Sequence, residues 1–214
     1  MTLRFLERLD WAYTRWMVGG SCKIIYHNFV QHITLWYRLL MERRFNSDRH
    51  TIMPPNFFEG YDLRAFMASI ATYPNFMVAW WDVDTVLLPI HSSPNHRLFG
   101  ELRLASMEVH IYDSLGRGAY EKFKFDGTFT KFEVCVVHYL DKIDYWDRRN
   151  IPRIPLNIQF IFETNVPQQS SLLGDCGVFV CMFMEQLVPG QPIRELIDQR
   201  NAALEFRQRM EKII

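Results

Sequence analysis

Cys176, in the segment PQQSSLLGDCGVFV, is the residue whose type and setting point most directly to chemistry. A thiol attacks a carbonyl as thiolate, and a helix N-terminus favours the thiolate because free backbone N–H groups and the helix dipole stabilise negative charge. Gly174 interrupts the preceding segment and Asp175 is a good N-cap, so we expect a helix to begin at Cys176. The same N–H groups could hold an oxyanion. The alternative is a buried cysteine that packs as a small hydrophobe, which is how we interpret Cys181.

A nucleophilic thiol needs an imidazole as base and a third group that fixes the imidazole. His96, in PNHRLFGEL, stands where a predicted strand begins, and Asp113, in HIYDSLG, stands where the next strand ends. Adjacent antiparallel strands bring these two ends together, which predicts a His–Asp pair. Taken singly, His96 could be a loop histidine and Asp113 a turn residue, so the combination carries the prediction. His91 is the nearest alternative base, and His110 is expected to face solvent or a neighbouring side chain.

Hydrophobic periodicity predicts the elements that must position these residues. We expect helices over 32–44, 132–143, 177–188 and 192–214, and strands over 84–90, 97–104, 108–116 and 156–163. The segment 177–188 is apolar on almost every side, which is typical of a helix enclosed between layers. The segment 45–61 contains Pro54, Pro55, Asn56 and Gly60 and is predicted to be a surface loop. Helices flanking a mainly antiparallel sheet make an α+β fold.

The composition of the 214 residues predicts one globular unit with a large core, since 49% of them are hydrophobic and 15% aromatic. The 24 basic and 24 acidic side chains balance, so we expect neither nucleic acid nor a membrane as a partner. The four cysteines contain no CxxC pair, which argues against a disulfide framework and against a metal site. We therefore expect reduced thiols, in the nucleus or cytoplasm. The N-terminus is interrupted by Arg4, Glu7, Arg8 and Asp10 and has no signal-peptide core.

The order of these motifs, a histidine, then YDSL, then PQQ, then GDCGVFVC, resembles the SUMO-specific Ulp1-like cysteine peptidases, especially their large plant group. The likeness covers most of the chain. It implies a papain-like α+β fold with a central, mainly antiparallel sheet flanked by helices and the nucleophile at the N-terminus of a buried helix. We expect a single domain over 1–214, with a helical N-terminal part over 1–75 and a catalytic core over 76–214.

The resemblance also implies a role for each site residue. Cys176 would be the nucleophile, His96 the general base and later the acid, Asp113 the group that orients the imidazole, and Gln169 a lining residue of the oxyanion hole. The run from the glutamines to Cys176 is one residue longer than in the family, so Gln168 is an alternative to Gln169. The implied substrate is a SUMO-like modifier with its conjugates, and the implied protein is a monomer without cofactor or metal.

The chain departs from the family where two tryptophans clamp the Gly-Gly tail of the modifier. Arg97 follows the histidine in place of one tryptophan, and His27 stands nearest to the position of the other. Arg97 also sets a cation beside His96, which is expected to disfavour the protonated imidazole. These departures keep two alternatives open, a non-catalytic binding module derived from a mobile element and a viral adenain-like peptidase. We assign substrate binding to Arg97, His27 and Trp36, with Trp80 and Trp81 as further aromatic candidates.

Overall fold

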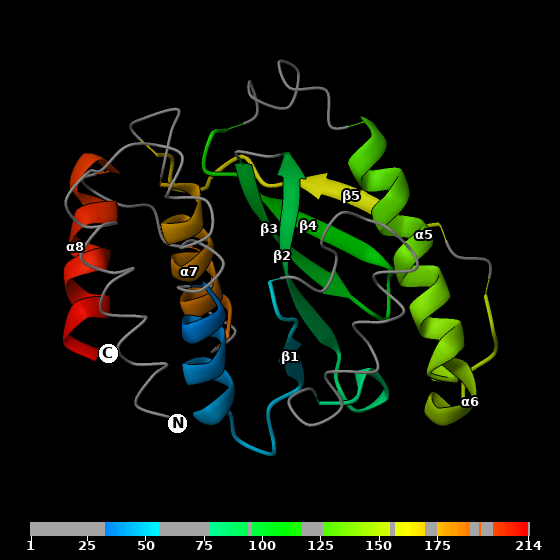
Figure 1. Cartoon of the computed structure of the whole chain (residues 1–214). Helices are drawn as coiled ribbons and strands as arrows, with labels where there is room; N and C mark the ends of the chain where they lie inside the picture. The colour runs from blue at the N-terminus through cyan, green and yellow to red at the C-terminus, as the bar shows by residue number, and fades with distance from the viewer. Residues whose placement is uncertain are drawn as a thin grey trace.

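A five-stranded sheet in the order β1-β2-β3-β4-β5 forms the centre of the molecule (Figure 1). The computed structural model describes residues 33–55, 78–93, 96–116, 126–154, 157–169, 175–188, 193 and 199–213, so the predictions for His27 lie outside the described residues. The strands are β1 His50–Ile52, β2 Thr85–Ser93, β3 His96–Arg103, β4 Glu108–Tyr112 and β5 Gln159–Phe162.

The three inner strands pair antiparallel, β2 with β3 and β3 with β4, as the sequence predicted. The two edge strands pair parallel, β1 with β2 and β4 with β5, so the sheet is mixed. A parallel pair needs a crossover, and between β4 and β5 the chain forms α5 (Asp126–Lys142) and α6 (Tyr145–Arg149). The first of these helices corresponds to the one predicted over 132–143 and begins earlier.

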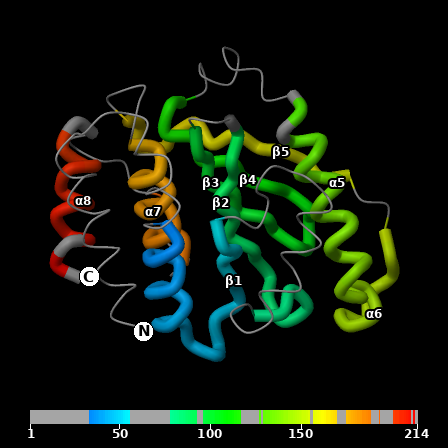
Figure 2. The backbone as a smooth tube through the Cα atoms, viewed as in Figure 1, coloured from blue at the N-terminus to red at the C-terminus, as the bar shows by residue number. Residues whose placement is uncertain are grey.

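Helices cover both faces of the sheet, which gives three layers (Figures 1 and 2). One face carries α7 (Cys176–Leu187) and a helix over residues 33–42, with α8 (Gln199–Ile213) on their outer side, and the other face carries α5 and α6. The inner strands are therefore buried on both sides, which explains why they read as nearly continuous apolar runs. The predicted α+β class is confirmed.

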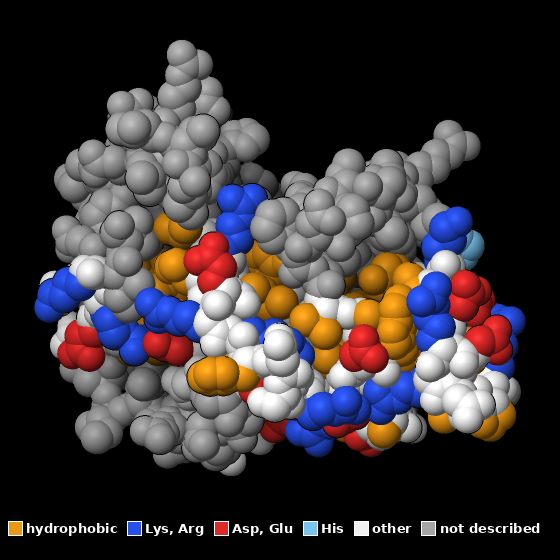
Figure 3. Space-filling view, turned by 90° about the horizontal axis from the view of Figure 1, so that it is seen from below, with side chains coloured by type: hydrophobic (Ala, Val, Ile, Leu, Met, Phe, Trp, Pro, Cys, Tyr) orange, Lys and Arg blue, Asp and Glu red, His pale blue; other side chains and the backbone are white. Residues whose placement is uncertain are grey.

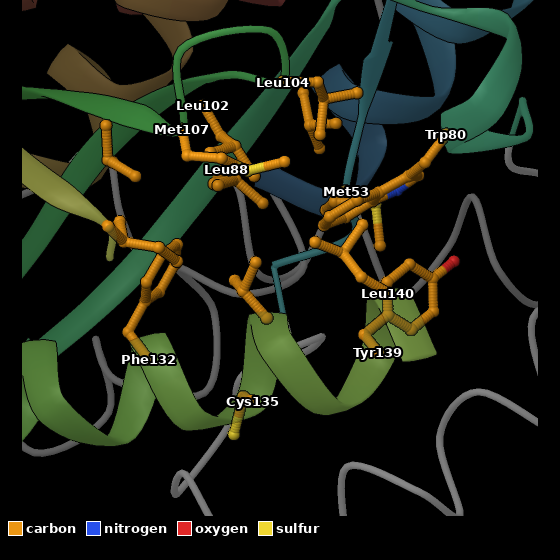
Figure 4. Packing of buried hydrophobic residues seen from close by; sticks show 14 of the residues in the cluster. Met53, Trp80, Leu88, Leu102, Leu104, Met107, Phe132, Cys135, Tyr139 and Leu140 are labelled. Carbon is orange, nitrogen blue, oxygen red and sulfur yellow. The ribbon is translucent and has the colours of Figure 1, made fainter. Parts of the chain in front are cut away.

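The core between the sheet and α5 is built from large side chains of distant segments (Figure 4). Trp80 lies in the short 3-10 helix η2 (Trp80–Asp82), is fully buried, and packs edge to face on Tyr139 of α5 with ring centroids 4.6 Å apart. Its indole N–H donates to the sulfur of Met53 at 3.4 Å. Full burial of such a side chain contributes about 1.5–3 kcal/mol or more, so this core holds η2 and the end of β1 to α5.

The core on the other face encloses α7 between the sheet and α8. The described part of α7 from Cys176 to Met184 is buried throughout, as its all-round apolar sequence predicted. Trp36, assigned to substrate binding, lies in this core instead. Its side chain is 2% exposed and packs edge to face on Phe206 of α8 at 5.3 Å. The assignment of Trp36 is corrected, because its ring is covered by α8 and has no surface to offer a substrate.

The prediction of a loop over 45–61 is wrong at His50–Ile52, which form the strand β1. Thr51 and Ile52 are fully buried, and His50 to Ile52 pair with Thr85 to Leu87 of β2. Three residues between polar and proline-rich flanks give too short a pattern for periodicity to detect. β1 forms because β2 offers an unpaired edge beside it.

The face of the molecule seen from below in Figure 3 presents basic and acidic side chains close together. Asp84 Oδ1 forms ion pairs with the Nη2 atoms of Arg49 and Arg149, each at 2.9 Å. The hydrogen bonds from these two guanidinium groups lower the pKa of the Asp84 carboxyl to about 2. This exposed network ties β1 and α6 to the start of β2.

Of the helices in the described ranges, none combines the length and apolar character needed to cross a bilayer.

Candidate functional site

His96, Asp113 and Cys176 come together at one end of the sheet. His96 is the first residue of β3, Asp113 directly follows β4, and Cys176 is the first residue of α7. The antiparallel register, in which Phe99 of β3 faces Tyr112 of β4, places the start of one strand beside the end of the other. Three chain segments far apart in sequence thus meet at one point.

The imidazole of His96 is bonded to the carboxylate of Asp113, with Nε2 and Oδ1 2.8 Å apart. Both side chains are nearly buried, 6% and 5% exposed. Asp113 Oδ1 also accepts the backbone N–H of Leu115 at 2.8 Å, and the Asp113 carbonyl accepts the N–H of Gly116 at 3.0 Å. Two backbone donors therefore fix the carboxylate and the turn that carries it, and the carboxylate fixes the ring.

The pKa of His96 is raised to about 9. Burial alone lowers it, but the hydrogen bonds to Asp113 and Cys176, together with the negative charges of both, outweigh the burial. Because Nε2 is held by Asp113, Nδ1 is the ring nitrogen left for the Cys176 sulfur. The causes of this shift are burial, Asp113 and Cys176, so the expectation that Arg97 disfavours the protonated ring stays a prediction. At neutral pH the imidazole carries the proton and can pair with a thiolate.

Asp175 does not cap α7 through its side chain, contrary to the sequence-based expectation. Its carboxylate forms an ion pair with Arg207 of α8 instead. Its backbone carbonyl still accepts the N–H groups of Val178 at 2.9 Å and Phe179 at 3.1 Å, so the first turn of the helix forms. The change of partner docks α8 onto the start of α7, directly beside Cys176.

Gln169 is tied to the residue after Asp113. Its backbone N–H donates to the Ser114 carbonyl at 2.8 Å, and its side-chain Oε1 accepts the Ser114 hydroxyl at 2.9 Å. Gln168 lies against Gly116 instead, where its side chain leaves no room for a Cβ atom. The two glutamines left open by the sequence therefore have different neighbours, and Gln169 is the one anchored through its carboxamide oxygen.

Gly116→Ala is expected to destabilise the protein by about 1–2 kcal/mol, because Gly116 has φ +76° and a left-handed conformation disfavours any side chain. The new methyl carbon would also lie 2.8 Å from Gln168 Nε2. Urea unfolding measures the change as a lower midpoint with an unchanged slope. Gly127→Ala is the matched control, since nothing lies within 4 Å of a Cβ there and alanine favours a helix. Equal stability of the two variants would contradict the strain at Gly116.

The remaining candidates lie outside this constellation. Arg97 is half-buried in β3 and faces His91 of β2 across the ladder, so these two residues form one cross-strand position beside His96. His110 is a sheet residue whose Nδ1 bonds Glu163 Oε1 at 2.6 Å. Cys181 is buried, and burial raises the pKa of its thiol, which keeps it protonated as a core residue. Within the part of the chain that the structure describes, no three His, Cys, Asp or Glu side chains gather as metal ligands.

Ser114 is the site residue that sequence reasoning missed. It is 1% exposed and holds Gln169 from both its backbone and its side chain. Its signal was present in the sequence, because Ser114 is the third letter of the YDS motif that gave Asp113. The partner, 55 positions further along, could not be read from that motif.

Comparisons with known proteins give a consistent result. Residues 32–214 match the family described as the Ulp1 protease family, C-terminal catalytic domain. The fold is similar to that of the C-terminal Ulp1 protease domain in complex with Smt3, the yeast ortholog of SUMO, with a TM-score of 0.56 and 14% identity over 98% of this chain and 93% of that one. It is also similar to the SUMO protease Ulp1 with its catalytic cysteine oxidised to a sulfonic acid, with a TM-score of 0.54 and 15% identity over the same shares. Among curated protein sequences, none matches the chain.

Proposed function

The chain belongs to the Ulp1 protease family, and from that premise we propose that it is a cysteine peptidase that releases a SUMO-like modifier from its precursor or conjugates. The observation that carries the proposal is the arrangement of His96 between the Asp113 carboxylate and the Cys176 thiol. A raised histidine pKa, a buried carboxylate and a thiol at the start of a helix, all in one place, are typical of a catalytic site. The SUMO-like substrate is suggested by the Ulp1 domain that was solved with Smt3.

The proposed reaction is acyl transfer through a thioester. Cys176 Sγ, as the thiolate of the ion pair, attacks the carbonyl carbon of the last glycine of the modifier, and the C=O electron pair moves onto oxygen. Backbone N–H groups at the start of α7 and the Gln169 carboxamide are the proposed donors to that oxyanion. His96 then gives its proton to the leaving amine as the C–N bond breaks, and the thioester remains.

Hydrolysis of the thioester completes the cycle. His96, now neutral, takes a proton from a water molecule that attacks the acyl carbon, and the C–S bond breaks to regenerate the thiolate. Asp113 holds Nε2 throughout, which keeps Nδ1 directed at the sulfur and stabilises the imidazolium each time it forms. We place this activity in the nucleus or cytoplasm, where thiols stay reduced.

The test is labelling by a SUMO vinyl sulfone, whose electrophile occupies the place of the scissile carbonyl. The expected result is a covalent adduct on Cys176, located by mass spectrometry, with Cys176→Ala unlabelled. A ubiquitin vinyl sulfone run in parallel reports on the choice of modifier. If neither probe nor any other modifier probe labels Cys176 in the folded protein, the peptidase proposal is wrong.

A second candidate, a binding module without turnover, is favoured by Arg97, which stands where the family places a clamping tryptophan. A cation beside the tail lacks the flat face that selects glycine. The two functions separate in one pair of measurements. A module binds a SUMO-like protein but does not label with its vinyl sulfone, whereas the peptidase does both.

A further inference from the structure

The turn over residues 113–116 connects the two halves of the site. Asp113 holds the imidazole, while the next residue, Ser114, makes two hydrogen bonds to Gln169 in the segment that leads to Cys176. The backbone bond, from Gln169 N–H to the Ser114 carbonyl at 2.8 Å, sets the position of the chain. The side-chain bond, from the Ser114 hydroxyl to Gln169 Oε1 at 2.9 Å, sets the orientation of the carboxamide.

A carboxamide carries an acceptor on one side and an NH₂ donor group on the other. In the structure the Oε1 side faces Ser114 and accepts its hydroxyl, so the Nε2 donor group points away from Ser114. Ser114 is 1% exposed, so bulk water does not compete for its hydroxyl at this bond. Losing this buried bond would leave a polar atom unsatisfied at a cost of about 1–3 kcal/mol, so the bond holds the carboxamide in the orientation that the structure shows.

We propose that Ser114 is a positioning residue that orients the Gln169 carboxamide so that Nε2–H donates to the oxyanion of the tetrahedral intermediate. The inference rests on the proposed thiol acyl transfer and adds a residue to it. As the S–C bond forms and the C=O pair moves onto oxygen, a donor already held in place needs no reorganisation, which is the condition under which oxyanion donors contribute most. Ser114 does not touch the reacting atoms and acts through Gln169.

The action of Ser114 through Gln169 can be separated from an effect on its neighbour Asp113. The Asp113 side chain is held by the backbone N–H of Leu115 and by His96, and its carbonyl by the N–H of Gly116. None of these bonds uses the Ser114 hydroxyl. Ser114→Ala removes one oxygen atom, so the carboxylate–imidazole pair should keep its geometry while the carboxamide loses its anchor.

The experiment compares two reactions of Cys176 in the full chain. Acylation by p-nitrophenyl acetate passes through an oxyanion and needs no modifier, whereas alkylation by iodoacetamide needs the thiolate and forms no oxyanion. Both rates are corrected with Cys176→Ala. For Ser114→Ala we expect acylation to slow about tenfold, a fraction of the 10²–10³-fold that loss of a whole oxyanion donor costs, with alkylation within about twofold of wild type.

Three further variants complete the test. Ser114→Thr keeps the hydroxyl and should recover the acylation rate. Ser106→Ala removes an exposed hydroxyl whose partner is Glu108 at 2.8 Å, and should change neither rate. In a Gln169→Ala background, Ser114→Ala should add almost nothing, because two residues that act through one group are not additive.

Each outcome decides the inference. Unchanged acylation in Ser114→Ala overturns it, as does an equal fall of acylation and alkylation, which would assign Ser114 to the Asp113–His96 pair. A full additional loss in the Gln169→Ala background also overturns it, and so does a wild-type Cys176 that the ester does not acylate. If SUMO vinyl sulfone fails to label Cys176 while the ester results are as expected, the proposed substrate is wrong and the role of Ser114 stands.

Discussion

Cys176→Ala should lower turnover of a SUMO-like substrate by at least about 10⁴-fold, because without the sulfur no thioester forms and the remaining donors stabilise an attack that cannot begin. The same variant should keep its affinity for the modifier, since one small side chain at a helix start contributes little to a protein interface. The loss is measured as release of the modifier from a fluorogenic C-terminal amide, and the affinity by calorimetry with the uncleaved modifier.

Cys181→Ala is the matched control for this prediction. Cys181 lies one and a half turns further along α7, is 1% exposed, and has a thiol whose pKa is raised by burial. Its removal should cost about 1 kcal/mol of stability through the small cavity that it leaves, with turnover retained. A Cys176→Ala protein that still turns over substrate, or a Cys181→Ala protein that folds but does not, would reject Cys176 as the nucleophile.

Asp113→Asn is expected to reduce kcat/KM by tenfold to thirtyfold at pH 8 and much less at pH 6. The raised pKa of His96, about 9, means that the imidazolium is present below pH 9 and is lost as the pH rises through 9, so the wild-type alkaline limb should lie there. Asparagine removes the negative charge that supports the imidazolium, and the limb moves down toward or below 6.5, the ordinary histidine value. A pH–rate profile of both proteins measures the displacement.

The substitution isolates the charge because its shape is conserved. Asp113 Oδ1 accepts both His96 Nε2 and the N–H of Leu115, and an amide oxygen can keep both bonds. The other oxygen, Oδ2, is buried and has no hydrogen-bond partner among the described residues, so an NH₂ group in its place breaks no bond that the structure records. An equal loss at pH 6 and pH 8 would contradict the electrostatic role and indicate a displaced ring.

The raised pKa of His96 also bears on the expected effect of Arg97 on the imidazole. A cation next to the imidazole was expected to weaken the ion pair, yet the pKa of the ring is raised, because its interactions with Asp113 and Cys176 outweigh burial. We therefore expect Arg97, which stands in the place of the family's tryptophan, to affect substrate recognition more than the proton chemistry. His91, opposite Arg97 in the ladder, belongs to the same surface position and should be tested with it.

Several features could be predicted from the sequence because their causes are local. The apolar run over 177–188 requires a buried helix, Cys176 stands at its start, and the alternating strands place His96 and Asp113 at neighbouring strand ends. Periodicity and strand adjacency are short-range consequences of backbone geometry, so they hold whatever lies around them. The family resemblance, carried by the spacing of these same motifs, is confirmed over residues 32–214, while the plant group stays a prediction.

Other features depended on partners that arrive from distant parts of the chain. Asp175 is a good N-cap by type, but Arg207 of α8 takes its carboxylate, since a charged partner outcompetes a backbone N–H. Trp36 has the chemistry of a substrate clamp and becomes a core residue because Phe206 covers it. β1 is a strand because β2 pairs with it, despite a loop-like sequence.

The sequence by itself determined the candidates for the nucleophile, the base and the orienting carboxylate, since each sits at the end of an element that periodicity specifies. Only the tertiary structure decided the surroundings of each candidate. The fold raised the pKa of His96 by placing Asp113 and Cys176 around a buried ring. It also distinguished Gln169 from Gln168, because Gln169 bonds the hydroxyl of Ser114, which lies 55 positions earlier in the chain. Charge and hydrogen bonding act across space, and a linear pattern carries no record of which distant groups the fold will bring within their reach.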